Sequence, residues 1–278
     1  MAGGMRKTVD PIRGNPSPYG LLGGCVEVVD VTDLHELNGT QFVPLSCAET
    51  HTWERDCPPP TVPNPETKIF DRPGVCEFEP VTAYAGSTCS TFGMTYDEAV
   101  EHATETLRMG EQRTLEAWFM MNALCSLAED NDLTPASGAL PAAQGIAALE
   151  GWLAEHYGGE GILHIPAGAS ALLGCCNVVT RTRDTQCPET LMGNGVVMGA
   201  GYATNVGGPT CTQAPDGEAW LYITGPVRVR RGPLDIIPPT EAASIDTRLN
   251  DRYVLAERTS VIEVACCEAA AVRISTCC

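Results

Sequence analysis

The residues best suited to catalysis in this sequence are His164 and the adjacent cysteines Cys175 and Cys176. A histidine close to a cysteine can remove the thiol proton and so create a nucleophile. His164, however, lies in the apolar run Ile162–Ile165, and a buried histidine in such surroundings usually has its hydrogen bonds satisfied. We therefore expect His164 to be structural.

Other signals for a reactive site are weak. Residues Gly158–Gly161 are glycine-rich, but they precede a predicted strand, whereas a phosphate-binding loop follows a strand and opens a helix. No metal-ligand spacing relates the remaining histidines, His35, His51, His102 and His156. The sequence thus predicts no catalytic, cofactor-binding or metal-binding residue. A cysteine- or metal-dependent enzyme is the alternative from another functional class.

Fourteen cysteines also require an explanation. None forms a C-x-x-C motif, and no cysteine and histidine cluster has zinc-finger spacing, so no structural metal site is predicted. We expect most of these cysteines to be small buried thiols. The alternative is disulfide formation after release from a reducing cytoplasm, mainly among the cysteines of the turn-rich region, Cys47, Cys57, Cys76 and Cys89.

The charge is unevenly distributed. The formal net charge is −18, and residues 1–160, with 24 acidic and 8 basic residues, account for −16 of it. Such acidity argues against a protein that mainly grips phosphate backbones, but it suits a wall around nucleic acid, or simple solubility. Arg228 and Arg230 are a local exception. Strand alternation places both on one face, where they suit ion pairs between subunits or a DNA contact.

A single long helix is predicted from Thr95 to about Leu127. Thr95 and Glu98 form a capping box, and about 1.5 Å per residue gives the helix a length of roughly 50 Å. The bulky run Trp118–Met121 requires burial on more than one side, part of which a second chain could supply. Apolar or small residues recur at helical spacing at Val100, Ala103, Leu107, Gly110, Thr114, Ala117, Met121 and Leu124.

The regions on either side of this helix differ. The first ninety residues are rich in proline and glycine and predict an arm and an extended loop, with one short strand at Val26–Val31. The second half predicts helices at Pro141–Tyr157 and Pro166–Leu173 among several strands. These strands are Ile162–Ile165, Gly195–Gly199, Ala219–Thr224, Val227–Arg231, Tyr253–Val264 and Ala270–Ile274.

Targeting signals are also lacking in the sequence. No apolar run approaches the roughly 20 residues of a membrane span, and Met1–Gly14 has no apolar segment of the kind found in secretory signals. We therefore expect synthesis in the cytoplasm and no membrane partner.

Four stretches carry a resemblance to a known family: Gly161–Leu173, Gly195–Tyr202, Trp220–Arg230 and Arg248–Arg258. Together with the order of arm, proline-bearing loop, long helix, helix-strand-helix block and late long strand, they resemble the major capsid proteins of tailed bacteriophages. The resemblance covers roughly Thr95–Thr276. It implies an α+β protein with the Hong Kong 97-type capsid fold, comprising an arm, an extended loop, a peripheral domain with a long spine helix, and an axial α/β domain.

The resemblance also implies a domain division and a function. The expected parts are an arm at 1–42, an extended loop at 43–92, a peripheral domain at 93–140 and 236–264, and an axial domain at 141–235 and 265–278. Such a chain is a non-enzymatic subunit of an icosahedral virion shell, assembled in the host cytoplasm. An encapsulin-like compartment shell with the same architecture is the alternative function.

The same resemblance suggests partners and contact residues. Copies of the chain would form pentamers and hexamers around double-stranded DNA, without sequence-specific contacts, and separate scaffolding, portal and decoration proteins are candidate partners. Some relatives join subunits by a lysine–asparagine isopeptide bond. Lys68 lies in the expected loop, but no asparagine and catalytic glutamate match it. The residues expected at assembly contacts are Lys68, Trp118, Phe119, Arg228 and Arg230.

Overall fold

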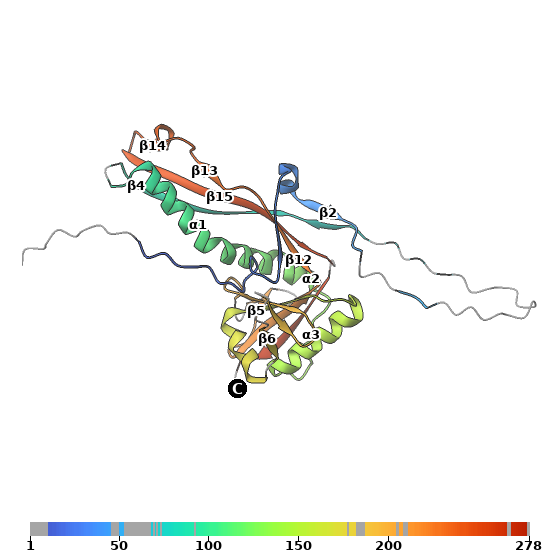
Figure 1. Cartoon of the computed structure of the whole chain (residues 1–278). Helices are drawn as coiled ribbons and strands as arrows, with labels where there is room; N and C mark the ends of the chain where they lie inside the picture. Colours follow the sequence, from blue (N-terminus) through green and yellow to red (C-terminus); the bar gives the residue numbers. More distant parts are fainter. Residues whose placement is uncertain are drawn as a thin grey trace, which may run out of the picture.

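The computed structural model describes residues 11–45, 50–52, 68, 70, 72, 74–91, 93–176, 178–181, 187–203, 206–207, 211–265 and 268–276. In these ranges the chain forms an elongated molecule with one large sheet toward each end (Figure 1). The helices are α1 (Tyr96–Phe119), a π-helical turn η2 (Met120–Leu124), α2 (Cys125–Leu127) and α3 (Ala142–His156), with 3-10 helices η1 (Leu34–Asn38), η3 (Ala167–Cys176) and η4 (Ala242–Ser244).

The first sheet is built around the long strand β15 (Asp251–Val264), which pairs antiparallel with β4 (Pro80–Ser90) over the whole length of β4. β12 pairs with the C-terminal part of β15, and β1 adds to β12 in parallel. Helix α1 covers one face of this sheet through β4 and β15 (Figure 1). The remaining strands are β1 (Glu27–Asp30), β12 (Val227–Arg231), β13 (Asp235–Ile237) and β14 (Ile245–Asp246).

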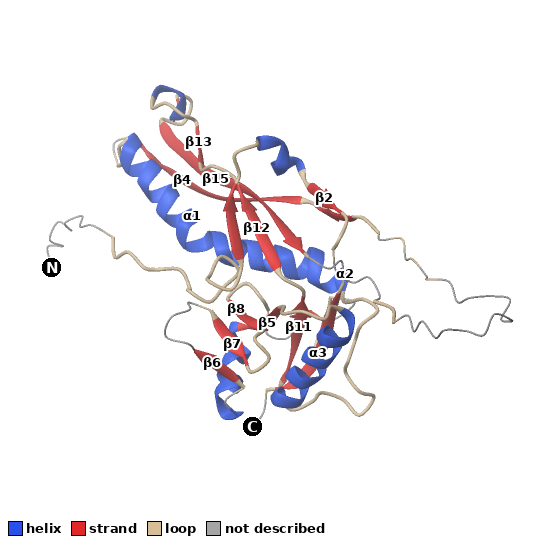
Figure 2. Cartoon of the chain, turned by 45° about the vertical axis from the view of Figure 1, so that its right-hand side comes forward, coloured by secondary structure: helices blue, strands red, loops and turns tan. Residues whose placement is uncertain are grey.

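The second sheet has the strand order β16-β11-β5-β8-β7-β6, and in it only β5 and β8 are parallel neighbours. Helix α3 packs on β16 and β11 (Figure 2). The strands are β5 (Ile162–Pro166), β6 (Val179–Arg181), β7 (Pro188–Thr190), β8 (Gly195–Gly199), β11 (Glu218–Thr224) and β16 (Ala269–Ser275). Two further pairs are β2 (Thr40–Phe42) with β3 (Cys76–Phe78) and β9 (Val206–Gly207) with β10 (Thr212–Gln213).

Most predicted elements are confirmed within two residues, but β4 corrects the prediction of an arm and loop throughout the first ninety residues. This strand has eleven residues, most of them small or hydroxylated, and only Val81 and Ala83 among its apolar side chains are buried. Such a pattern is a weak strand signal in the sequence. The backbone partner that makes it a strand is β15, which lies about 170 positions further along the chain.

The long helix is confirmed from its cap to Leu127. Thr95 N–H donates to Glu98 Oε2 at 2.7 Å, and Glu98 N–H donates to Thr95 Oγ1 at 3.3 Å. The hydrogen bond from the Thr95 backbone lowers the pKa of Glu98. Beyond Phe119 the helix continues through the π-helical turn into α2. The capping box predicted from the sequence therefore sets where this helix begins.

The predicted apolar stripe of this helix is only partly correct. Ala103 and Leu107 are buried, but Thr114, Ala117 and Met121 are exposed. Their places on the buried face are taken by residues that include two carboxylates, Glu111 and Glu116. The burial of these carboxylates is compensated by hydrogen bonds, which an arginine side chain donates to Glu111 and backbone N–H groups donate to Glu116. A hydrophobicity pattern does not reveal such partners.

The described residues form two apolar cores. One lies between α1 and the first sheet and continues onto the second sheet, so that Phe119 and Leu124 share it with Val197 and Tyr222. The other lies between the second sheet and α3 and contains Ile146, Leu149, Leu163 and Leu221, among others. The two sheets are thus joined through a common core. No described helix has the length and apolarity that crossing a membrane requires.

The cysteines depart from the expectation of free buried thiols. Cys25 is bonded to Cys187 and Cys125 to Cys211, and Cys76 is also disulfide-bonded. Within the described residues Cys89, one of the cysteines considered for disulfides, is a free thiol. Pairing links cysteines far apart in sequence, so local spacing could not predict it. Cys47, Cys57 and the vicinal pairs Cys266–Cys267 and Cys277–Cys278 lie outside the described residues.

Candidate functional site

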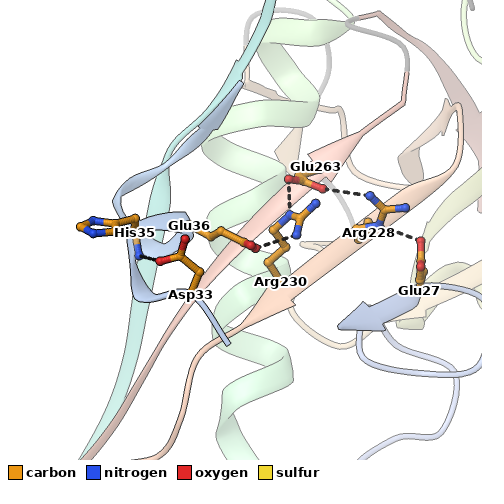
Figure 3. Close-up of polar contacts among 7 residues, drawn as sticks. All are labelled: Glu27, Asp33, His35, Glu36, Arg228, Arg230 and Glu263. Carbon is orange, nitrogen blue, oxygen red and sulfur yellow. Dashed lines mark hydrogen bonds and ion pairs between the residues drawn. The ribbon is translucent and has the colours of Figure 1, made fainter. Parts of the chain in front are cut away.

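Arg228 and Arg230 of β12 form a charged cluster with glutamates from β1, η1 and β15. Arg228 lies opposite Glu27 of β1 on one side and opposite Glu263 of β15 on the other. Its Nε donates to Glu27 at 2.7 Å, and its Nη1 lies 3.8 Å from Glu263. Figure 3 shows this row of charges across three strands. The positive charge of Arg228 is therefore compensated by glutamates of the same chain.

Arg230 is more tightly held than Arg228. It donates to Glu263 and to Glu36 of η1, both at 2.6 Å (Figure 3). The hydrogen bond to Glu263 raises the pKa of Arg230. Glu263 is 4% exposed, so its charge depends on the arginines for compensation. As predicted from strand alternation, Arg228 and Arg230 share one face.

We predict unequal effects when these arginines are truncated. Arg230→Ala removes two charge-assisted hydrogen bonds from a largely buried site and should lower the free energy of unfolding by about 2 kcal/mol. Arg228→Ala removes a half-exposed, solvent-screened pair and should cost less than about 1 kcal/mol. Urea unfolding of the two purified variants measures this difference. Equal losses would mean that Glu263 is not held mainly by Arg230.

A groove of about 1000 Å³ adjoins this cluster. The charged residues form one part of its lining, and Phe42, Val43 and Leu45 form an apolar part. Leu45 is fully exposed and Val43 half-exposed in the isolated chain. Glutamates already neutralise the two arginines, so the described lining of the groove is part charged and part apolar and has no unpaired arginine for a phosphate.

His164 occupies the second sheet, close to the core shared by both sheets. Its Nδ1 lies 3.0 Å from the Tyr202 hydroxyl and its Nε2 lies 3.0 Å from Thr224 Oγ1. Burial lowers the pKa of His164 to about 3. The imidazole is neutral and bonded at both nitrogens, which confirms the predicted burial and hydrogen bonding, and its structural role stays a prediction. The side chains of Cys175 and Cys176 lie outside the described part of the structure.

His164 should make the fold sensitive to mild acid. Its folded pKa, about 3, lies below its ordinary value of 6.5, so below pH 6.5 the unfolded chain binds a proton that the folded chain excludes. Its contribution to stability is therefore lost as pH falls, by about 2 kcal/mol between pH 7 and pH 5. Urea unfolding at both pH values measures this loss. His164→Gln should remove most of it, and an unchanged pH slope in that variant would contradict the assignment.

The other predicted contact residues lie in different environments. Phe119 is 0% exposed and belongs to the chain's own core, with its ring 5.7 Å from that of His164. This burial corrects the expectation of a contact between subunits at Phe119. Trp118 is partly exposed beside the same core, and Lys68 is exposed. Roles for Trp118 and Lys68 at subunit contacts stay predictions.

The sequence pointed to the arginines but not to their partners. Glu27 and Glu263 come from β1 and β15, which the strand register brings beside β12. Glu36 comes from η1, which follows β1 in the chain. Acidic residues at alternating positions of the neighbouring strands would be the available signal, but it cannot be read without the register. Among the described residues, no three His, Cys, Asp or Glu side chains are grouped so that they could hold a metal ion.

Comparisons with known proteins agree with this architecture. No protein-family profile and no curated protein matches the sequence. Among solved structures, the chain is similar to the capsid of an empty GTA particle, with 13% identity and a TM-score of 0.55 over 98% of this chain and 95% of that chain. It is also similar to the mature capsid of bacteriophage PhiM1, with 12% identity and a TM-score of 0.52 over 99% and 93% of the two chains.

A third similar structure is that of Microbacterium phage Oxtober96, with 9% identity and a TM-score of 0.54 over 99% of this chain and 95% of that chain. At such low identities the likeness concerns the course of the backbone. It nevertheless extends over nearly the whole of both chains. The chain therefore has the α+β, Hong Kong 97-type fold of these phage capsid structures.

Proposed function

We propose that this chain is the major capsid protein of a tailed bacteriophage and self-assembles into the icosahedral head shell around double-stranded DNA. The observation that carries the proposal is the likeness to capsid chains over 98–99% of this chain and 93–95% of theirs. A fold by itself can serve several functions. Further support therefore has to come from the surface of this chain.

The surface supports association with other copies. Several large apolar side chains are strongly exposed, including Ile12 at 101%, Leu45 at 103%, Phe70 at 86% and Tyr84 at 70%. Three of them lie on segments outside the sheets and helices, and Tyr84 lies on the first sheet, in β4. Segments of this kind are usually covered by a neighbour. Repeated heterologous contacts of this type close into rings of five and six.

The two sheets form the basis for a proposed division of the shell subunit into two domains. We assign the first sheet with α1 to the peripheral domain and the second sheet with α3 to the axial domain around the local symmetry axes. Because β12 pairs with β15 of the first sheet, we assign β12 to the peripheral domain as well. Apart from β1 and β4, which belong to the first sheet, residues 1–42 would be the arm and 43–92 the extended loop over a neighbour, with Lys68 and Trp118 at subunit contacts.

The proposed DNA contact is non-specific. Arg228 and Arg230, the candidates for phosphate contacts, are paired with Glu27, Glu36 and Glu263, and the chain carries a net charge of −18. We therefore expect DNA to be enclosed without sequence-specific contacts. Scaffolding, portal and decoration proteins are candidate partners, and assembly would take place in the host cytoplasm before the chain becomes part of the virion.

Expression of the full chain tests the proposal. Electron microscopy and sedimentation should show closed shells or their pentamers and hexamers. A folded monomer at micromolar concentration would contradict a shell function and favour the enzyme alternative. Particles purified from infected cells should contain double-stranded DNA. A defined protein cargo in place of DNA would favour the encapsulin-like compartment.

A further inference from the structure

Two disulfides have both of their cysteines in the described part of the chain. Each of them joins the first sheet or its helix to the second sheet. Cys25 precedes β1 of the first sheet, and its partner Cys187 directly precedes β7 of the second. Cys125 lies in α2, the end of the long helix, and its partner Cys211 lies between β8 and β11 of the second sheet. Two independent bonds thus cross the same junction.

Non-covalent contacts bring the parts of this junction together without the disulfides. The Leu21 N–H donates to Glu116 Oε1 at 3.0 Å and the Gly201 N–H donates to Glu116 Oε2 at 2.7 Å, so one carboxylate joins the N-terminal segment, α1 and the segment after β8. The Met198 N–H donates to Tyr19 O at 2.7 Å. The core shared by the two sheets lies beside these contacts. These contacts hold the two sides of the junction together independently of the disulfide bonds.

We propose that the bonds Cys25–Cys187 and Cys125–Cys211 form an oxidative clamp, which closes on an already folded chain and fastens the two sheets to each other. The timing rests on the proposed function, because glutathione and thioredoxin keep thiols reduced in the cytoplasm where the shell would assemble, and oxidation by molecular oxygen persists only after release from the cell. For each bond, two thiols lose two electrons and two protons, and one oxygen molecule takes them up as hydrogen peroxide. The remaining sulfur atoms form the disulfide.

The clamp should act mainly on resistance to unfolding. The bonds span 162 and 86 positions of sequence, and closing long loops restricts the unfolded chain most strongly. Since native packing is already present, the folded structure should change little. We expect oxidation to raise the Tm of the chain by on the order of 10 °C.

The test uses the full chain purified under a reducing agent and then divided into a reduced sample and one exposed to oxygen. Peptide mapping by mass spectrometry without reduction should find Cys25 linked to Cys187 and Cys125 to Cys211 in the oxygen-exposed sample only. Its Tm should be higher than that of the reduced sample. Cys89→Ser, which removes a described free thiol, is the matched control and should keep the full difference.

The double variant Cys187→Ser/Cys211→Ser should lose most of the difference in Tm between the two samples. The clamp is refuted if this variant keeps the whole difference, or if mapping of the unmodified chain finds these cysteines unpaired after oxygen exposure. Mapping needs no variant, so a variant that fails to fold does not block the test. If shells form but the two samples have the same Tm, the clamp is refuted and the shell function is not. If the chain stays a monomer but oxidation raises its Tm, only the shell function is refuted.

Discussion

Replacing Phe119 by alanine is expected to lower the free energy of unfolding by about 3–5 kcal/mol, the cost of an aromatic ring removed from a packed core. Phe119 is completely buried where α1 meets both sheets, and its ring contacts that of His164 edge to face. The cavity left by its removal would loosen the two sheets from each other. Because a domain is stable by only about 5–15 kcal/mol, much of the stability would be lost. Urea unfolding of the purified variant measures the loss.

Met121→Ala is the matched control for Phe119→Ala. Met121 lies two residues further along the same helix, in the π-helical turn, but it is 46% exposed. Its truncation should change the free energy of unfolding by no more than about 0.5 kcal/mol. Similar losses for both variants would point to an effect on the helix as a whole. A Phe119→Ala chain as stable as the unmodified one would restore Phe119 as a candidate for subunit contacts.

The second large effect is expected at Glu111, which is 2% exposed on the buried face of α1. Arg231 donates to it through Nε at 3.0 Å and Nη2 at 2.5 Å, and Arg258 donates through Nη1 at 3.0 Å. Glu111→Ala leaves two arginines facing a buried site without their shared counter-ion. Such a break in a buried ion pair costs about 3–5 kcal/mol, which thermal and urea unfolding would both register.

Two further variants serve as controls for Glu111→Ala, and the first of them separates charge from volume. Glu111→Gln keeps the size of the side chain but removes the charge, so it should be destabilised, though less than Glu111→Ala. Glu105→Ala removes a partly exposed ion pair with Arg108 on the same helix and should cost less than about 1 kcal/mol. If Glu111→Ala were no worse than Glu105→Ala, the three-residue cluster would not contribute to the attachment of α1 to the first sheet.

Local features of the fold could be predicted because their causes are local. The capping box at Thr95 and the long helix follow from helical spacing and from side chains within four residues of each other, and the strand Gly195–Gly199 follows from a short apolar run between turn residues. The placement of Arg228 and Arg230 on one face follows from the alternation of side chains along a strand. So does the structural reading of His164, since its neighbours in the strand are apolar.

The sequence by itself thus determined most of the helical and extended segments, β4 excepted, and the order and residues of those segments carried the resemblance that indicated the type of fold. Only the tertiary structure decided which residues meet: β4 with β15, Cys25 with Cys187, and Glu111 with its two arginines. These partners lie between about 120 and 170 positions apart, so their contact depends on strand register and on the path of the chain. Phe119 illustrates the limit, because its bulk predicted burial but not whether its own chain or a neighbour would provide it.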